Sequence, residues 1–423
     1  MSTSIQPTPS FFYGWRIVSV AFVFMMLIVG FAVYGLPLFY NLWVAESGYQ
    51  RAEIQFGNTL GKLIAGPVLG FFVGWLIDRR GPRGVMTAGV VCAALALVGF
   101  SFAHSLSWFY GCFLLNALGY LCAGPLANQV LLAHWFNRLR GRVMGIAYVG
   151  IGVGGMLVPW VIFFLNRHCG WRGTMQILGA LFAVILGLLL LVVRRRPQDL
   201  DLLPDGVGAD FAAPPTAALP LGGVLGTAAF WLLAIGSVLS IAAVGGVMQN
   251  LALYLADILP TDKVEWTKTT IASLTLTASI AGRLTMGWLS DRIPRKYVMV
   301  LTCTLVGAAI PLLIGAQHHP ALLYVFAVLF GFGLGADYML IPLMAADCFG
   351  LATLSRILGL IVMSDTIGEA TMPYLVAHLR DSHGAYAGAF WLLTLLALIG
   401  AGAIALIRYR GGQPGCRNAI PSA

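Results

Sequence analysis

The sequence predicts an all-α integral membrane protein with twelve transmembrane helices in two six-helix halves. Of its 423 residues, 59% are hydrophobic and 10% are charged, whereas a soluble domain carries about 25% charged residues. A membrane-spanning helix needs about 20 apolar residues, so twelve helices use roughly 240 positions and leave short loops, one linker and two tails. A motif at the end of the second predicted helix recurs 213 positions later. These observations exclude a water-soluble protein.

The apolar runs between charged residues and Pro/Gly breaks set the expected helices. A Pro-, Ala- and Gly-rich stretch after three arginines separates the halves. We expect an N-terminal bundle over residues 1–193, a cytoplasmic linker over 194–225, a C-terminal bundle over 226–410 and a cytoplasmic tail over 411–423. The predicted helices lie near 14–40, 52–77, 84–103, 107–133, 141–165 and 172–193, and then near 228–257, 267–289, 297–316, 321–345, 356–378 and 386–408.

The distribution of lysine and arginine predicts the orientation. With both termini inside, the inner connections hold seventeen of these residues and the outer connections hold six. Positive residues favour the cytoplasmic side, so we expect cytoplasmic termini in a cell membrane. The formal charge of +9 comes in short clusters next to apolar runs, which indicates contact with anionic lipid and argues against a nucleic-acid partner. Two basic residues, Lys62 and Arg283, remain within the membrane.

The repeated motif carries the first family resemblance. Gly74-Trp75-Leu76-Ile77-Asp78-Arg79 ends the second predicted helix, and Gly287-Trp288-Leu289-Ser290-Asp291-Arg292 ends the eighth. Two such halves, with a G-x-x-x-D-R-x-G-x-R loop in the first at Gly74, Asp78, Arg79, Gly81 and Arg83, resemble the major facilitator superfamily, and the resemblance implies its fold. Acidic and basic side chains at helix ends can lock neighbouring helices in one state and release them in another. The expected gating residues are Asp78, Arg79, Asp291 and Arg292.

Within that superfamily the chain is most similar to the monocarboxylate transporter family and its bacterial relatives, which include oxalate:formate exchangers. The resemblance implies a bacterial inner-membrane protein that moves a small monocarboxylate, such as L-lactate or pyruvate, with a proton. It implies a monomer, no cofactor and no metal. The features that carry it are Tyr13-Gly14-Trp15, Gly66-Pro67, His134-Trp135-Phe136 with Arg138 and Arg140, and Arg283.

Arg283 is the expected substrate-binding cation. A charge inside the membrane costs a few kcal/mol, so it should face an internal cavity, and its planar guanidinium matches a carboxylate in bidentate fashion. The alternative is an arginine held permanently by a structural carboxylate. The animal relatives carry an aspartate four residues earlier and a lysine in the first helix, whereas this chain has Ser279 and no such lysine. Lys62 could supply a second positive charge, or extend to the membrane surface.

Acidic residues within the membrane are the candidates for proton coupling. Asp365 and Glu369 are four residues apart on one helix face, and two carboxylates at that spacing in low dielectric disfavour each other's ionisation. For each candidate, a structural ion pair is the alternative to a proton role. The candidates are Asp257, Asp337, Asp365 and Glu369.

Polar residues near the middle of the membrane are candidates for binding the rest of the substrate. A 2-hydroxy acid needs partners for its hydroxyl group and an apolar wall for its methyl group. Leu27 or Ile28 could provide the wall, and Asn116 and Tyr120 share one helix face. For each tyrosine, packing at a helix interface is the alternative. The polar candidates are Tyr34, Asn116, Tyr120, Tyr148, Gln249, Tyr254 and Tyr338.

Other functions have less support in the sequence. The chain shows no motif of metallopeptidases, nucleotide-binding loops or serine hydrolases, so we expect no enzymatic activity. An oxalate/formate exchanger resembles this chain but places a lysine in the eleventh helix, where Asp365 and Glu369 stand here. A drug/proton antiporter would suit the acids but not Arg283 and Lys62. A sensor that binds without transport would need a signalling domain, and neither the linker nor the tails indicates one.

Overall fold

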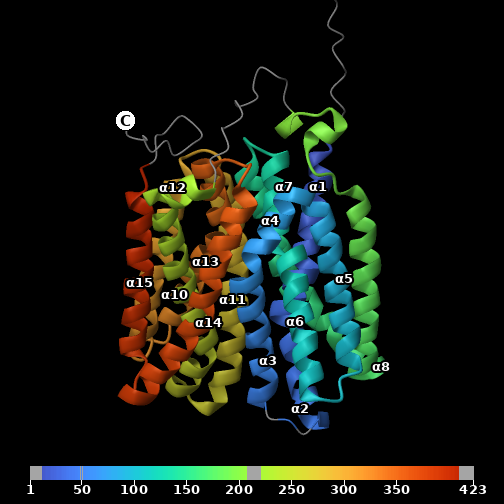
Figure 1. Cartoon of the computed structure of the whole chain (residues 1–423). Helices are drawn as coiled ribbons and strands as arrows, with labels where there is room; N and C mark the ends of the chain where they lie inside the picture. The colour runs from blue at the N-terminus through green and yellow to red at the C-terminus, as the bar shows by residue number, and fades with distance from the viewer. Residues whose placement is uncertain (1–11, 48, 50, 207–220, 409–423) are drawn as a thin grey trace, which may run out of the picture.

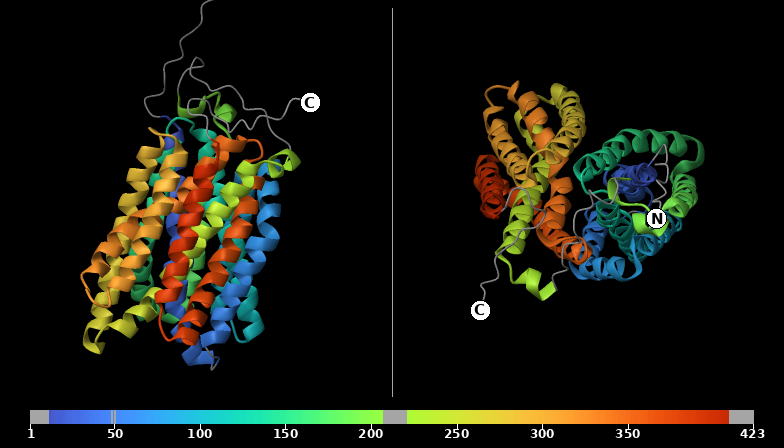
Figure 2. Two further views of the ribbon diagram at one scale, coloured as in Figure 1. Left: turned by 90° about the vertical axis from the view of Figure 1, so that its left-hand side faces the viewer. Right: turned by 90° about the horizontal axis from the view of Figure 1, so that it is seen from above.

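The chain is an all-helical bundle in two halves packed side by side (Figures 1 and 2). The computed structural model describes residues 12–47, 49, 51–206 and 221–408, so the predicted tail over 411–423 lies outside the described residues. Both halves run roughly parallel to one long axis. We call the end of the bundle where α1 begins and α15 ends the linker end, because the segment between the halves lies there, and the opposite end the far end.

The N-terminal half begins with a long first span that changes its helical geometry several times. Its second and fourth spans are also interrupted, whereas α8 runs through two predicted spans. The elements are α1 Gly14–Phe24, η1 Met25–Val29, η2 Phe31–Gly35, η3 Leu36–Phe39, α2 Tyr40–Ser47, α3 Arg51–Ile64, η4 Ala65–Leu69, α4 Gly70–Arg80, α5 Pro82–Ser101, α6 Leu106–Ala123, α7 Pro125–Trp135 and α8 Arg140–Val192.

The C-terminal half follows a connection with two short 3₁₀ turns. Its six long helices are joined by short loops. The elements are η5 Pro197–Leu200, η6 Pro204–Gly206, α9 Leu221–Leu225, α10 Ala228–Ile258, α11 Thr261–Ser290, α12 Arg295–Gly315, α13 Leu322–Phe349, α14 Leu354–His383 and α15 Ala387–Leu406.

The described helices account for all the predicted spans. Nine helical stretches are long and apolar enough to cross a membrane. The stretch Arg140–Val192 is divided at Gly170, whose φ of 66° interrupts the helical backbone, so it contains both predicted spans over 141–165 and 172–193. The helices α11 and α14 carry more polar residues and complete the twelve. The first span reaches Ser47, beyond the predicted end at 40.

Two spans of the N-terminal half contain π-helical turns where the sequence predicts regular helix. The first includes Met25–Val29 and Phe31–Gly35, and the second includes Ala65–Leu69. Pro67 lies in the second of these spans, and proline cannot donate the regular helical hydrogen bond. Such turns add a residue to the helical circuit and rotate the following side chains, and they are frequent at functional sites. They therefore change which side chains of these spans face the other half.

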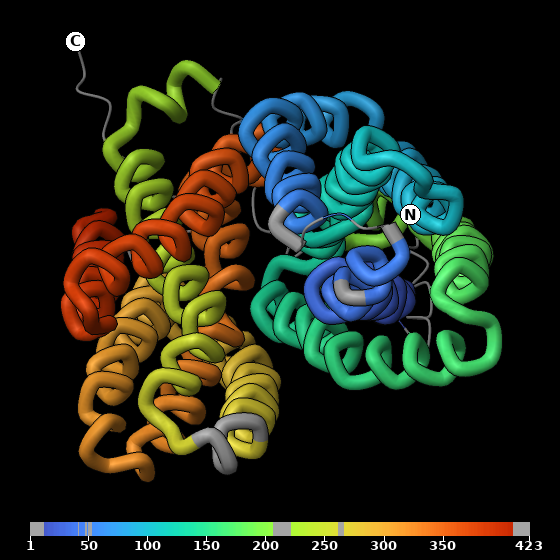
Figure 3. Tube along the Cα trace, turned by 90° about the horizontal axis from the view of Figure 1, so that it is seen from below, coloured from blue at the N-terminus to red at the C-terminus, as the bar shows by residue number. Residues whose placement is uncertain are grey.

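The halves meet through two helix pairs related by the internal repeat. In one pair, α4 packs on α14: a Cβ at Gly359 would lie 2.5 Å from the carbonyl oxygen of Gly70. In the other, α11 packs on α8: a Cβ at Gly145 would lie 2.5 Å from the carbonyl oxygen of Arg283. Small residues permit such close approach of backbones. Gly70 and Arg283 occupy the same repeat position, so the second half carries an arginine where the first has a glycine. Figure 3 shows the two bundles from the far end.

Candidate functional site

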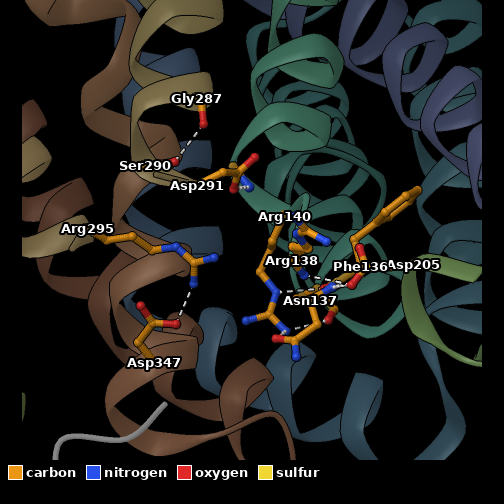
Figure 4. Close-up of polar contacts among 12 residues, drawn as sticks. Phe136, Asn137, Arg138, Arg140, Asp205, Gly287, Ser290, Asp291, Arg295 and Asp347 are labelled. Carbon is orange, nitrogen blue, oxygen red and sulfur yellow. Dashed lines mark hydrogen bonds and ion pairs between the residues drawn. The ribbon is translucent and has the colours of Figure 1, made fainter. Parts of the chain in front are cut away.

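Two aspartates of the repeated motif bridge the halves at the linker end. The Asp78 carboxylate of α4 accepts a hydrogen bond from Arg356 Nε of α14 at 2.7 Å. In the second copy, the Asp291 carboxylate accepts hydrogen bonds from the backbone N–H groups of Gly141 and Arg142 at 2.7 and 2.9 Å, at the start of α8. Burial raises the pKa of Asp291, and these donors and nearby arginines oppose that effect. Figure 4 shows this carboxylate pointing at α8.

The arginines of the repeated motif lie elsewhere. Arg79 stacks over Trp75 with 5.3 Å between the guanidinium carbon and the ring centre, and Arg292 stacks over Trp288 at 3.8 Å. Both are cation–π contacts within the same helix end. The basic partners of the aspartates are instead Arg356 and, at 3.7 Å, Arg142.

Further polar contacts hold the linker end together (Figure 4). Arg140 is buried and donates to the carbonyl oxygens of Phe136 and Ala133 at 2.9 and 3.1 Å. Asp205, in the segment that connects the halves, accepts hydrogen bonds from three consecutive backbone N–H groups, those of residues 137–139. Arg295 forms an ion pair with Asp347 in the C-terminal half. The connection is thus fastened to the same loop that leads into α8.

Arg283 lies on the face of α11 that packs against α8. Its side chain is 7% exposed. Its Nη1 donates to Ser279 Oγ at 3.1 Å, whereas its Nε is buried without a partner. A Cβ at Gly152 of α8 would lie 3.5 Å from Nη1, so the guanidinium touches the opposite half. No ion pair among the described residues includes Arg283. A buried cation without an anion is energetically costly.

Two tyrosines of the N-terminal half surround this guanidinium. Tyr34, in the second π-helical turn, packs against Gly155 of α8, and Tyr148 lies one helical turn before Gly152. Both phenols are within electrostatic range of Arg283. Tyr148 is 2% exposed, and its hydroxyl accepts a hydrogen bond from the Gln129 amide. The surroundings of Arg283 are therefore rich in hydrogen-bond donors.

A cavity of about 90 Å³ lies between the halves, and its wall does not include Arg283, Tyr34 or Tyr148. Gln129 connects the cavity with the surroundings of Arg283, because it lines the cavity and bonds to Tyr148. Aliphatic side chains from α7, α13 and α14 form most of the remaining wall, as in other small-molecule sites. The predicted site residues that line it are Tyr120, Tyr338, Asp365 and Glu369.

The three membrane acids of the C-terminal half form a cluster around Tyr338. Tyr338 donates to Glu369 Oε2 at 3.3 Å. Ser237 donates to Asp365 Oδ1 at 2.7 Å, and Ser240, one turn further along α10, donates to Asp337 Oδ2 at 2.9 Å. Asp337 is fully buried and its Oδ1 has no partner. None of the ion pairs among the described residues includes these acids.

Three other predicted residues of the N-terminal half, Ile28, Asn116 and Lys62, do not line the cavity. Ile28 is buried, 3.7 Å from the position of a Cβ at Gly124. Asn116 is half-buried on α6, and Lys62 is exposed on α3.

Three predicted residues of α10 lie away from the cavity. Gln249 is exposed. Tyr254 is buried in the C-terminal half, where it donates to the carbonyl oxygen of Leu313. Asp257 forms an exposed ion pair with Arg380 at 2.8 Å. The structure does not bring these residues together with Arg283.

The sequence did not single out Gln129, Ser237 or Ser240. Each is a polar residue inside an apolar helix, a signal that could have drawn attention to them. It could not have shown which carboxyl or phenol each one contacts, because that depends on the rotation of neighbouring helices.

The chain belongs to the Major Facilitator Superfamily. The sequence profile of that family matches residues 20–262 and 259–419. The predicted all-helical fold class is confirmed, and the protein is a multi-pass membrane transporter, not an enzyme.

Relatives and solved structures agree with this assignment. The chain is 28% identical to monocarboxylate transporter 13 of Rattus norvegicus over 93% of this chain and 88% of the relative. It is 26% identical to the uncharacterized MFS-type transporter YcxA of Bacillus subtilis (strain 168), over 73% and 74%. The structure of the proton:xylose symporter XylE bound to 6-bromo-6-deoxy-D-glucose is similar with a TM-score of 0.72 at 14% identity, covering 92% and 94%. That of the human organic anion transporter MFSD10 gives 0.69 at 15%, covering 92% and 99%.

Proposed function

We propose that this protein carries a small monocarboxylate, such as L-lactate or pyruvate, across a bacterial inner membrane together with a proton. The observation that carries the proposal is Arg283, a buried guanidinium at the interface of the halves with no acidic partner among the described residues. An arginine that served only structure would be expected to have a carboxylate beside it. The name of the rat relative supports the same substrate class.

The acid cluster supports coupling to a proton. Asp337, Asp365 and Glu369 lie near one another without a cation, so ionisation of all three would be strongly unfavourable. In our proposal, the substrate anion neutralises Arg283, and a proton neutralises an acid beside the cavity. The pair of substrate and guanidinium and the protonated acid then each carry no net charge, which lowers the cost of excluding water as the halves rock. Asp365 and Glu369 are the proposed proton carriers because they line the cavity.

The inner gate is formed by the contacts at the linker end. Because basic residues cluster at that end, we place it, with both termini, in the cytoplasm. Asp78 and Asp291 then hold the cytoplasmic side closed through Arg356 and the start of α8. Transport proceeds by alternating access, with the two halves rocking around the site at their interface. We assign the transport unit to a single chain, because each proposed site residue comes from it.

The test is L-lactate uptake into proteoliposomes at a series of imposed pH gradients. We expect accumulation to rise with an inward proton gradient in the wild type. Arg283→Lys keeps the charge but loses the two-pronged geometry, which contributes about 1.5–3 kcal/mol, so apparent affinity should fall roughly tenfold to a hundredfold. Uptake that ignores the gradient would remove the proton from the mechanism. Unchanged affinity in Arg283→Lys would remove the arginine from the site.

A panel of competing anions separates this proposal from anion exchange. Lactate, pyruvate, acetate, formate and oxalate should each be tested against labelled L-lactate. The acids at positions 365 and 369 disfavour a dianion, so oxalate should compete poorly. Strong competition by oxalate, with uptake that requires oxalate inside the vesicles, would favour the exchanger.

A further inference from the structure

We propose that Tyr148 donates a hydrogen bond to the substrate carboxylate held by Arg283, and that Gln129 positions the phenol for this. The inference rests on the proposed function. It adds to that site a second side chain that binds the substrate carboxylate, as a hydrogen-bond donor. It begins from the geometry of α8, where Tyr148 lies one turn before Gly152, the glycine against which the Arg283 guanidinium packs. Both side chains are buried.

The hydrogen-bond inventory of this group is unbalanced. The Gln129 amide is assigned with its nitrogen toward the Tyr148 oxygen, and in this orientation the phenolic hydrogen of Tyr148 is left to donate elsewhere. Arg283 cannot accept it, since a guanidinium has donors only. Arg283 Nε is itself a buried donor without a partner. No hydrogen bond among the described residues has the Tyr148 hydroxyl or Arg283 Nε as its donor, so these two groups form a site for an anionic acceptor.

The hydrogen-bond donors of the site suit a carboxylate. A carboxylate has two oxygens and about four lone-pair directions, so it can take two donors from arginine and a third from a phenol. Gln129 also lines the cavity that holds Asp365 and Glu369. Gln129 therefore contacts both parts of the site. It bonds to Tyr148 beside the proposed anion site, and it lines the same cavity as the proposed proton carriers.

The test compares the dissociation constants of L-lactate, pyruvate and propionate for the purified, intact protein by titration calorimetry. Tyr148→Phe should weaken all three by about tenfold, because the lost bond goes to the carboxylate that they share. Tyr254→Phe is the matched control, since its phenol bonds to Leu313 inside the C-terminal half, and its dissociation constants should match the wild type. A loss confined to lactate and pyruvate would overturn the carboxylate assignment.

Gln129 is tested through non-additivity. Gln129→Ala should weaken binding less than Tyr148→Phe does, and the double variant should bind no worse than Tyr148→Phe alone, because Gln129 acts through the phenol. Additive losses would overturn the positioning role.

Arg283→Gln separates the two proposals: if it still binds L-lactate, the proposed function fails. If it does not bind, while Tyr148→Phe binds normally, the inference alone fails.

Discussion

At the residue scale, the protein separates positive and negative groups across one interface. Arg283 faces two tyrosines and glycines of α8, whereas the acids face serines of α10 and Tyr338. Arg283, Asp337 and Asp365 are buried and Glu369 is half-buried, each with neutral hydrogen-bonding partners instead of an opposite charge. Pairing them permanently would cancel the charges that an anion and a proton are needed to neutralise. The separation thus keeps both sites responsive to their ligands.

The acids give a prediction at this scale. Glu369→Gln and Asp365→Asn mimic permanently protonated side chains, so net uptake should lose its dependence on the pH gradient while exchange of labelled for unlabelled lactate continues. The control is Asp257→Asn, which alters an exposed ion pair with Arg380, and such exposed pairs contribute little to stability. Its gradient dependence should stay normal. If both cavity variants still accumulate lactate in response to the gradient, neither acid carries the proton.

At the element scale, α8 combines contact with the other half and support of the site. Gly141 and Gly145 meet α11 backbone to backbone, and Gly152 borders the guanidinium. A side chain at these positions would push α11 away and displace Arg283 with it. The helix therefore links closure of the linker end to the position of the binding group.

Gly145→Val tests this link. Its Cβ would lie 2.5 Å from the Arg283 carbonyl oxygen, and such overpacking costs typically 1–3 kcal/mol. We expect a lower thermal transition temperature and weaker lactate binding in detergent solution. Gly187→Val, on the same helix where no atom lies within 4 Å of the added Cβ, should change neither quantity. Normal binding by Gly145→Val would show that α8 does not need this close approach.

The sequence predicts much of this element structure, but not the rotation of each helix. Hydropathy and charge locate the spans, the repeat and Arg283, because a charge in a long apolar run is conspicuous. Nearly every face of these helices is apolar, so periodicity does not show which one turns toward the cavity. The π-helical turn that contains Tyr34 and the contact of Gln129 with Tyr148 depend on that rotation. Gln249 and Tyr254 show the same limit, since both lie on a predicted span but away from the cavity.

At the scale of the whole molecule, side-chain ion pairs and hydrogen bonds join the halves at the linker end. Gly74, Gly70 and Gly66 are one turn apart and all contact α14. Lys62 is the next residue on that face, and it is exposed. The backbone of α14 still approaches α3 here, but the Lys62 side chain is not covered. A rocking motion that opens the linker end should bring Lys62 against α14.

The Asp78–Arg356 pair should control that motion. Arg356→Glu places two carboxylates 2.7 Å apart in the geometry of the present pair, and this repulsion should open the linker end and close the far end. A cysteine at position 62, in a chain without its native cysteines, should then react more slowly with a membrane-impermeant thiol reagent applied from the far end. Adding Asp78→Arg to Arg356→Glu restores opposite charges and should restore the fast reaction. An unchanged rate in Arg356→Glu would mean that the two ends do not move as one rigid unit.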